Sequence, residues 1–372
     1  MKRDCILLAV DSLPIGGTER QVVELLRGLK ESGRFRVVLA LLDRGGELEA
    51  EAAQAAASVL RLSRRMRFDC TPALFLLRQA RQAGIRLIHA CGWMSALAAL
   101  PTARCLNVPI INGSIRAAPA RLQGRDRIST WCAVRSDWIV ANSHAGLAAH
   151  GLSDHPRAQV IANGIDFTRF DNVIAERQAN PTICMVANFS ARKDHASVIA
   201  ALPCVRRAFP QAELLLVGTD RGTLDDNRRL AERLGLRDAI RFVTHSLRPE
   251  SFIASSHVCV LASVHESLSN AILEYLALAK PVVATATCGD SAELIRNSEC
   301  GFLVPPHSPE SLAARIIALL RDPERAQRMG ESGRRQVQML TVPHMVSEYE
   351  ALYVRLLASP PAAPRVGARR QE

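Results

Sequence analysis

Two acidic residues that could do chemistry lie in HESLSNAILEYLALAKPVVAT, residues 265–285. Glu266 and Glu274 have seven residues between them, and a serine before Asn270 can cap a helix that begins near that residue. Free N–H groups at the start of a helix attract anions, whereas a carboxylate accepts hydrogen bonds from hydroxyl groups. These residue types suit a ligand with both negative charge and hydroxyls. The alternative is that both acids are surface residues favoured by the helix dipole.

Two further loops carry residue types that suit an anion. In PIGGTE, Gly16 and Gly17 form a turn between a strand and a helix, where backbone N–H groups can approach a negative charge. The turn is neither GxGxxG nor a P-loop, and glycine turns at strand ends can also be purely structural. In VANFSARKDH, Arg192 and Lys193 follow a buried strand. They either stabilise negative charge that develops in a transition state or are solvent-facing bases in a helix-capping loop.

The elements that must position these loops alternate between strand and helix. Strand-like apolar runs are expected at 5–10, 35–42, 85–90, 108–112, 136–143, 182–189, 212–218, 240–244, 256–263, 281–285 and 301–306. Helical runs lie between them, for example 20–33, with Gly33 as a C-cap. Such alternation predicts two parallel, doubly wound halves that bind their ligand at the carboxyl ends of the strands, in a cleft between them.

Several motifs together resemble one family. GGTERQVVELLRGL, VIANGIDFTRF, VANFSARKDH, LLLVG, the segment 265–285 and GFLVPP occur in the order and spacing of the retaining nucleotide-sugar glycosyltransferases of family four. The similarity runs from about residue 5 to 357. It implies an α/β chain with the glycosyltransferase B fold, in which two Rossmann-like domains face a central cleft. We expect an acceptor domain at 1–170, a donor domain at 171–342 beginning with a linker at 171–181, a helix at about 343–358 packing back on the first domain, and a disordered tail at 359–372.

The resemblance implies a nucleoside-diphosphate sugar as the donor substrate, with no cofactor and no metal ion. Lys193 would neutralise the diphosphate, Glu266 would bind sugar hydroxyls, and Glu274 would bind the ribose. Lys193 and Glu266 are the expected catalytic residues. The full expected donor site consists of Gly16, Gly17, Asn188, Arg192, Lys193, Glu266, Ser267, Leu268, Ser269, Asn270 and Glu274.

The chain departs from the family pattern at three positions. Asn188 stands where the family often has an arginine, Ser267 where it commonly has glycine, and Cys91 where it often has a histidine. Arg192 is therefore the candidate for a second cation. On the acceptor side the expected residues are His89, Asn112, Ser114 and Arg116, although His89 could equally be a core histidine at a strand end.

Composition and charge limit the possible settings. The net charge is +11, and residues 1–170 hold 23 Lys and Arg against 14 Asp and Glu, so the excess lies in the first half. The run RLSRRMRF at 61–68 adds to it, either as a solvated loop or as a contact for an anionic surface. No apolar run is long enough for a membrane span, and the start does not suit a signal peptide. We therefore expect a cytoplasmic protein that could contact the inner face of the membrane.

The expected reaction is retaining, metal-independent, hexosyltransferase-type transfer to a glycan or lipid-linked acceptor in bacterial capsule, exopolysaccharide or lipopolysaccharide synthesis. A nucleotide-sugar epimerase or a phosphorylase of the same fold is the alternative. Nucleic acid is not an expected partner, because aromatic residues make up 4% of the chain and are not interleaved with the basic ones. A dehydrogenase is disfavoured by the missing GxGxxG. The ten cysteines show no CxxC pair and are expected to be structural thiols.

Overall fold

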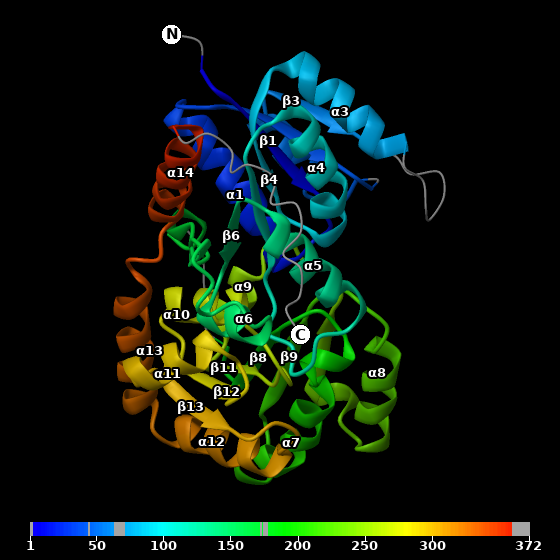
Figure 1. Ribbon diagram of the computed structural model, residues 1–372. Helices are drawn as coiled ribbons and strands as arrows, with labels where there is room; N and C mark the ends of the chain where they lie inside the picture. The colour runs from blue at the N-terminus through cyan, green and yellow to red at the C-terminus, as the bar shows by residue number, and fades with distance from the viewer. Residues whose placement is uncertain (1–2, 44, 63–70, 172, 174–177, 359–372) are drawn as a thin grey trace, which may run out of the picture.

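The computed structural model describes residues 3–43, 45–62, 71–171, 173 and 178–358. Most of the basic run at 61–68, part of the expected linker at 171–181 and the whole tail at 359–372 therefore lie outside the described residues. Two separate sheets, each with its own helices, make up the molecule (Figure 1). The expected α/β architecture of two Rossmann-like halves is confirmed.

The N-terminal domain is built on a parallel sheet of seven strands in the described residues, in the order β3-β2-β1-β4-β5-β6-β7. The strands are β1 Cys5–Val10, β2 Arg36–Leu41, β3 Ser58–Arg61, β4 Ile85–Ala90, β5 Ile110–Ile115, β6 Trp138–Ala141 and β7 Ala158–Val160. The helices are α1 Gly17–Ser32, α2 Glu49–Ala55, α3 Thr71–Ala83, α4 Trp93–Leu106, α5 Gly124–Arg135 and α6 His144–Ala149. The 3-10 turn η1, Phe167–Arg169, ends this half.

The C-terminal domain is built on a parallel sheet of six described strands in the order β10-β9-β8-β11-β12-β13. The strands are β8 Thr182–Val186, β9 Glu213–Val217, β10 Ile240–Val243, β11 Val258–Leu261, β12 Val282–Thr285 and β13 Gly301–Val304. The helices are η2 Ala191–Lys193, α7 His195–Ala208, α8 Leu224–Arg233, η3 Arg237–Ala239, α9 Glu250–Ser255, α10 Asn270–Ala277, α11 Asp290–Ser298, α12 Pro309–Arg321 and α13 Pro323–Val337. The last helix of the described chain, α14 Val342–Ala358, follows them.

Strand order places the loops that matter. The direction of winding reverses between β1 and β4 in the first sheet and between β8 and β11 in the second. A crevice opens beyond the carboxyl ends of the strands at each reversal, and ligands of such folds bind there. The glycine turn follows β1, the Arg192–Lys193 loop follows β8, and the loop with Glu266 follows β11. The topology therefore brings all three predicted loops to switch points.

Local sequence explains the two helices that face these crevices. Helix α1 has six consecutive buried residues, 21–26, and a seventh, Leu29, one turn later, and it ends at Gly33, whose φ of 62° suits glycine. Helix α10 begins at Asn270, as expected, with Ser269 at the N-cap position. The expected serine side-chain cap is wrong, because no such hydrogen bond forms there. The Ser267 hydroxyl instead bonds to Arg116 and Asn142 of the N-terminal domain.

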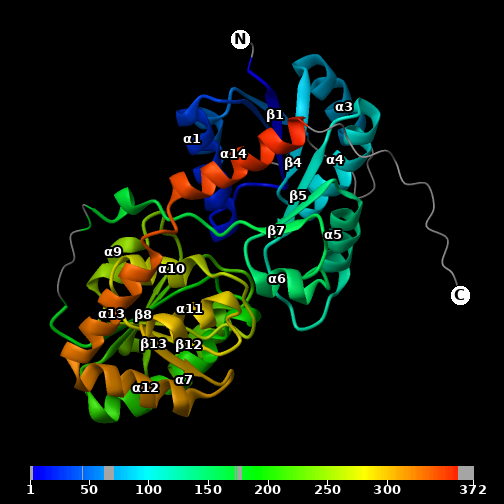
Figure 2. The same cartoon turned by 60° about the vertical axis from the view of Figure 1, so that its left-hand side comes forward.

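Helix α14 leaves the C-terminal domain and lies across the N-terminal domain (Figure 2). Its apolar residues Val346, Tyr349, Leu352 and Tyr353 join the core formed by β1, β2 and α1. Burial of one large apolar side chain in this way contributes about 1.5–3 kcal/mol to the free energy of unfolding. None of the helices within the described ranges is both long and apolar enough to span a membrane.

The two domains also touch directly near the crevices. The Asp290 carboxylate, at the start of α11, accepts hydrogen bonds from the backbone N–H groups of His144 (2.7 Å) and Ala145 (2.8 Å) at the start of α6. A carboxylate at a helix N-terminus is stabilised by the helix dipole. This contact holds the C-terminal domain against the N-terminal one in the present arrangement.

Candidate active site

A cavity of about 550 Å³ opens between the domains, where the loops after β1, β4, β8 and β11 meet. Twelve of the residues expected from the sequence line it: Gly16, Gly17, Ser114, Arg116, Asn188, Arg192, Lys193, Glu266, Leu268, Ser269, Asn270 and Glu274. Residues up to 258 positions apart thus share one surface, with acceptor-side Ser114 and Arg116 facing the expected donor side.

Ser267 is expected in the donor site but does not line the cavity. Its side chain is buried, and its hydroxyl donates to the Arg116 carbonyl oxygen at 2.9 Å, with the Asn142 side-chain oxygen 3.2 Å away. Both partners belong to the N-terminal domain. The Ser267 hydroxyl therefore joins the two domains beside the cavity.

His89 and Asn112 are the acceptor-side candidates that stay in the protein core. Both side chains are fully buried, and neither lines the cavity. The His89 ring lies under α14, with Nδ1 2.8 Å from the Tyr353 hydroxyl, and burial lowers its pKa from 6.5 to about 3. Asn112 accepts hydrogen bonds from the backbone N–H and hydroxyl of Ser114. His89 lies 3.6 Å from the Cys91 sulfur and Asn112 accepts from Ser114, and both Cys91 and Ser114 line the cavity.

Gly17 lies against the start of α10 in the other domain. A Cβ atom at Gly17 would lie 2.5 Å from the Asn270 side-chain nitrogen at the start of α10. Asn270 is in turn held by Asn163, which donates to its side-chain oxygen at 2.8 Å. The N-termini of α1 and α10 therefore face the same cavity from opposite domains. Their free N–H groups give the cavity a positive potential.

The Glu266 cluster, consisting of Glu266, Lys193 and Arg192, forms one part of the cavity wall. Lys193 Nζ makes an ion pair with Glu266, and Arg192 lies 3.5 Å from the same carboxylate. Burial alone would raise the pKa of Glu266, but the charges of Lys193 and Arg192 lower it below its usual value. With two cations for one acid, the cluster keeps a positive charge available for an anion.

The Glu274 cluster, consisting of Glu274, Glu250 and Arg169, has the opposite balance. The Arg169 guanidinium lies 3.2 Å from a Glu274 oxygen through Nη1 and 3.2 Å from a Glu250 oxygen through Nη2. Burial raises the pKa of Glu274, although Arg169 counteracts this. The two carboxylates share one largely buried cation, since Arg248, 3.6 Å from Glu250, is 84% exposed. Hydrogen-bond acceptors are therefore in excess here.

Sequence reasoning missed several residues of the cavity, among them Asp11, Glu19, Trp93, Arg125 and Arg169. Asp11 directly follows β1, so the rule that ligands bind at strand ends could have identified it. Its carboxylate accepts the backbone N–H of Ser95 at 2.7 Å and so orients the start of α4. Arg169 lies inside the recognised motif VIANGIDFTRF, but its partners are distant in sequence and gave no local signal.

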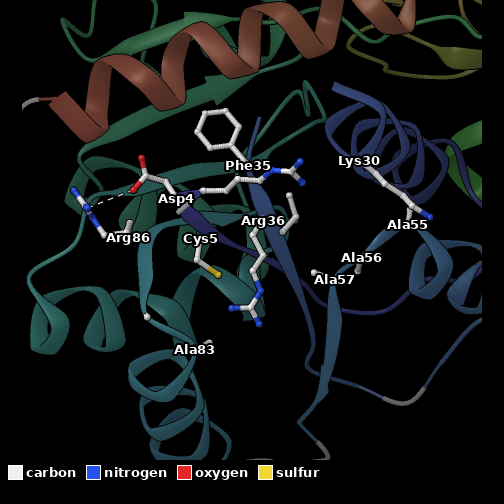
Figure 3. A pocket seen from close by; sticks show the side chains of 13 residues that line it. Asp4, Cys5, Lys30, Phe35, Arg36, Ala55, Ala56, Ala57, Ala83 and Arg86 are labelled. Carbon is white, nitrogen blue, oxygen red and sulfur yellow. Dashed lines mark ion pairs between the residues drawn. The ribbon is translucent and has the colours of Figure 1, made fainter. Parts of the chain in front are cut away.

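A second cavity, of about 680 Å³, lies at the opposite end of the N-terminal sheet, at the amino ends of β1, β2 and β4 (Figure 3). Arg86 pairs with Asp4 there at 3.3 Å. The helices α1, α2 and α3 all end beside it, so its basic residues are explained by the negative ends of three helix dipoles.

Nowhere in the described ranges is a group of three or more His, Cys, Asp or Glu residues placed to hold a metal ion.

Comparison with known proteins agrees with this arrangement. Residues 15–169 match the family model described as Glycosyltransferase Family 4, and residues 166–336 match that of Glycosyl transferases group 1. A glycogen synthase of Mycobacterium tuberculosis is 27% identical over 271 residues, which are 68% of this chain and 64% of that protein. The lipopolysaccharide core biosynthesis glycosyltransferase LpsE of Rhizobium meliloti is 30% identical over 240 residues, 61% of this chain and 65% of LpsE.

Solved structures share the fold over almost the whole chain. The Anabaena protein Alr3699/HepE, crystallised with UDP and glucose, superposes with a TM-score of 0.84 at 20% identity and covers 95% of this chain and 100% of its own. WaaG, a glycosyltransferase involved in lipopolysaccharide biosynthesis, superposes with a TM-score of 0.74 at 15% identity. The match covers 93% of this chain and 99% of WaaG. The resemblance read from the motifs and the fold is confirmed: this chain belongs to the group 1 glycosyltransferases and has their two-domain glycosyltransferase B fold.

Proposed function

We propose that this protein transfers a hexose-type sugar from a nucleoside diphosphate to a glycan or lipid-linked acceptor in the synthesis of a bacterial surface polysaccharide. The observation that carries the proposal is that Gly17, Lys193, Glu266 and Glu274 line one cavity between the domains. Names of relatives support the setting, since LpsE is a lipopolysaccharide core enzyme and EpsD of Bacillus subtilis is a putative glycosyltransferase. HepE, which binds UDP-glucose, supports a nucleotide-sugar donor.

Lys193 and Glu266 would exchange partners when the donor binds. Without ligand, they neutralise each other. A diphosphate is the stronger anion, so Lys193 and Arg192 would turn to it, and the freed Glu266 carboxylate would accept hydrogen bonds from sugar hydroxyls. The leaving diphosphate gains negative charge as the glycosidic bond breaks, and fixed cations stabilise that state more than the bound donor. We propose that these cations and the N-termini of α1 and α10 do so without a metal ion.

We propose that the sugar is transferred with retention of configuration. The new bond would form on the face from which the diphosphate leaves, and an oxygen of that diphosphate would take the acceptor's proton. The acceptor would enter from the N-terminal side, past Ser114 and Arg116. Arg116 donates to the Gly113 carbonyl oxygen at 3.0 Å and forms a hydrogen bond with Tyr349 of α14, so its position is fixed.

We propose that the N-terminal domain meets an anionic membrane through α3, α4 and α5, which lie side by side (Figure 1). These helices expose Leu74, Phe75, Leu97 and Trp131. Arginines lie among them, and the Arg135 guanidinium stacks 4.1 Å from the Trp131 ring centre. Apolar side chains with interspersed arginines suit the headgroup region of an anionic bilayer, where a lipid-linked acceptor would be held. The protein would then work on the cytoplasmic face of the inner membrane.

A thermal-shift screen of UDP-, GDP- and ADP-sugars tests the proposal. At least one donor should raise the melting temperature of the wild type, and it should raise that of Lys193→Ala and Glu274→Ala much less. The stabilising donor is then incubated with acceptor extracts, and the anomeric configuration of the product is determined by NMR. Stabilisation by none of the donors, or equal stabilisation of both variants and the wild type, would contradict the site. Turnover of the donor without any acceptor would favour an epimerase.

A further inference from the structure

We propose that Arg169 is a positioning residue that holds Glu274 in the orientation needed to accept hydrogen bonds from the nucleotide ribose. This inference rests on the proposed function, because it concerns how the same site takes its donor. Arg169 lies in η1, which is separate from α1 and α10, the two helices whose N-termini face the cavity.

The geometry fixes the direction of the Glu274 carboxylate. One arm of the planar Arg169 guanidinium bonds Glu274 at 3.2 Å, and the other bonds Glu250 at 3.2 Å. The side chains of Arg169, Glu274 and Glu250 are 18%, 16% and 5% exposed, so water screens their charges weakly. A guanidinium that is held at both arms has little freedom to rotate. One Glu274 oxygen is therefore tied, and the other can face the ligand.

Arg169 sits where the chain passes between the domains. The Ile165 N–H donates to the Leu340 carbonyl at 2.7 Å, and the Val342 N–H donates to the Ile165 carbonyl at 3.2 Å. The outgoing and returning chain segments are thus joined four residues or fewer from Arg169. Asp166 caps η1 by accepting the Thr168 N–H at 3.1 Å. Arg169 is anchored beside the crossing, whereas Glu274 lies on the donor-side helix α10.

Charge balance makes Arg169 necessary at this place. Charged groups face Glu274 or line the small space beside it from three elements besides its own: Glu250 of α9, Arg20 and Glu24 of α1, and Asp166 and Arg169 at η1. Arg27 of α1 pairs with Glu24 at 3.2 Å and Asp166 at 3.5 Å, and Arg248 lies 3.6 Å from Glu250. In the part of the chain that the structure describes, the cation that pairs with Glu274 itself is Arg169. Without Arg169, the neighbouring carboxylates would repel one another, and Glu274 would take up a proton more readily. A protonated carboxyl group uses one oxygen as a donor and accepts hydroxyl hydrogen bonds poorly.

Removal of ribose hydroxyls tests this role directly. Isothermal titration compares UDP, GDP and ADP with their 2′,3′-dideoxy forms on the wild type, Arg169→Met, Arg169→Lys and the control Arg248→Met. Arg248 contacts Glu250 at 3.6 Å but is 84% exposed. In the wild type, loss of the hydroxyls should weaken binding about ten- to a hundredfold. Arg169→Met should bind the normal nucleotide no more tightly than it binds the dideoxy form. Arg248→Met should show the same loss of affinity for the dideoxy form as the wild type.

A pH series provides a second readout that a purely structural role would not change. Binding to Arg169→Met should weaken at a higher pH than binding to the wild type as the pH is lowered, because its Glu274 becomes protonated first. Arg169→Lys restores one positive charge but not the two-armed contact, so it should recover the pH profile and only part of the affinity. Arg169→Lys also serves if Arg169→Met does not fold.

The outcomes separate this inference from the proposed function. If the wild type binds none of the three nucleotides, the proposed function fails and the role of Arg169 fails with it. A different outcome is that the wild type binds the normal nucleotide more tightly than the dideoxy form, while the Arg169 substitutions reduce the affinity for both nucleotides by the same factor at every pH. In that case the proposed function stands and the positioning role is wrong.

Discussion

Glu266 and Glu274 belong to one short segment, but the clusters around them carry opposite charge balances. The first has two cations for one acid, and the second has one cation for two acids. Lys193 and Arg192 outweigh burial and lower the pKa of Glu266, whereas burial raises the pKa of Glu274 in spite of Arg169. A site for a nucleotide sugar needs both kinds of surroundings, because a diphosphate requires positive charge and hydroxyls require acceptors. The difference shows how one loop and the helix after it can serve two chemically unlike parts of a ligand.

The largest expected effect comes from removing the excess positive charge of the first cluster. Lys193→Ala should lower kcat/KM for the donor about 10²- to 10³-fold, because a preorganised charge that stabilises the leaving group is lost. Lys30→Ala, which changes an exposed lysine of α1, is the matched control. Steady-state kinetics with the identified donor measure both variants. Unchanged kcat/KM in Lys193→Ala would show that the two clusters do not differ in function.

Neutralising the first acid should destabilise the protein, whereas neutralising the second should not. Glu266→Gln leaves Lys193 without its partner and should cost about 1–3 kcal/mol of unfolding free energy at pH 7. Glu274→Gln removes a buried charge and should be neutral or stabilising. Chemical denaturation measures both.

The pH dependence follows with the same opposition. The lowered pKa of Glu266 adds stability above the usual carboxyl pKa, and this is lost as the pH falls through its folded-state value. The raised pKa of Glu274 means that stability falls as the pH rises through its folded-state value. Equal losses in both glutamine variants across the pH range would refute the comparison.

His89 adds an acid-sensitive background that must be separated from the two clusters. Its pKa is about 3 in the folded protein, whereas the unfolded chain takes up a proton near 6.5. Its stability contribution is therefore complete above pH 6.5 and is lost as the pH falls below that value. Between pH 6.5 and 5.5, His89→Asn should lose about 1 kcal/mol less unfolding free energy than the wild type. Urea denaturation at both pH values measures this; identical losses would contradict the buried, neutral state.

The smallest effect is expected from the contact that holds the clusters in one cavity. Asp290→Ala removes two hydrogen bonds between the domains and should weaken donor binding about two- to fivefold, since a capping carboxylate contributes roughly 1 kcal/mol. Small-angle scattering should show a slightly larger radius of gyration without donor. Because Asp290 touches neither cluster, kcat at saturating donor should stay near that of the wild type. A large fall in kcat would assign Asp290 a role beyond domain contact.

Much of the fold could be predicted from sequence because its elements are locally encoded. Apolar runs such as 5–10 and 85–90 became β1 and β4 with the same bounds, and Gly33 ended α1. The two acids, the Arg192–Lys193 loop and the glycine turn were found because each follows a strand whose carboxyl end lies at a switch point.

The remaining features of the site depend on contacts between distant residues. His89 is buried because α14, more than 250 residues later, covers it. Ser267 bonds Arg116 and Asn142 in the other domain instead of capping α10. Arg169 pairs with Glu250 and Glu274, which lie 81 and 105 residues later in the sequence. No local pattern reports such pairings.

A crystal structure of the protein with its stabilising nucleotide sugar tests the central claim most directly. The diphosphate should lie within hydrogen-bonding distance of Lys193 Nζ, at the N-termini of α1 and α10, and the ribose hydroxyls should contact Glu274. Electron density for the donor that touches neither residue, or that lies in the basic cavity at the amino ends of β1 and β2, would contradict the account.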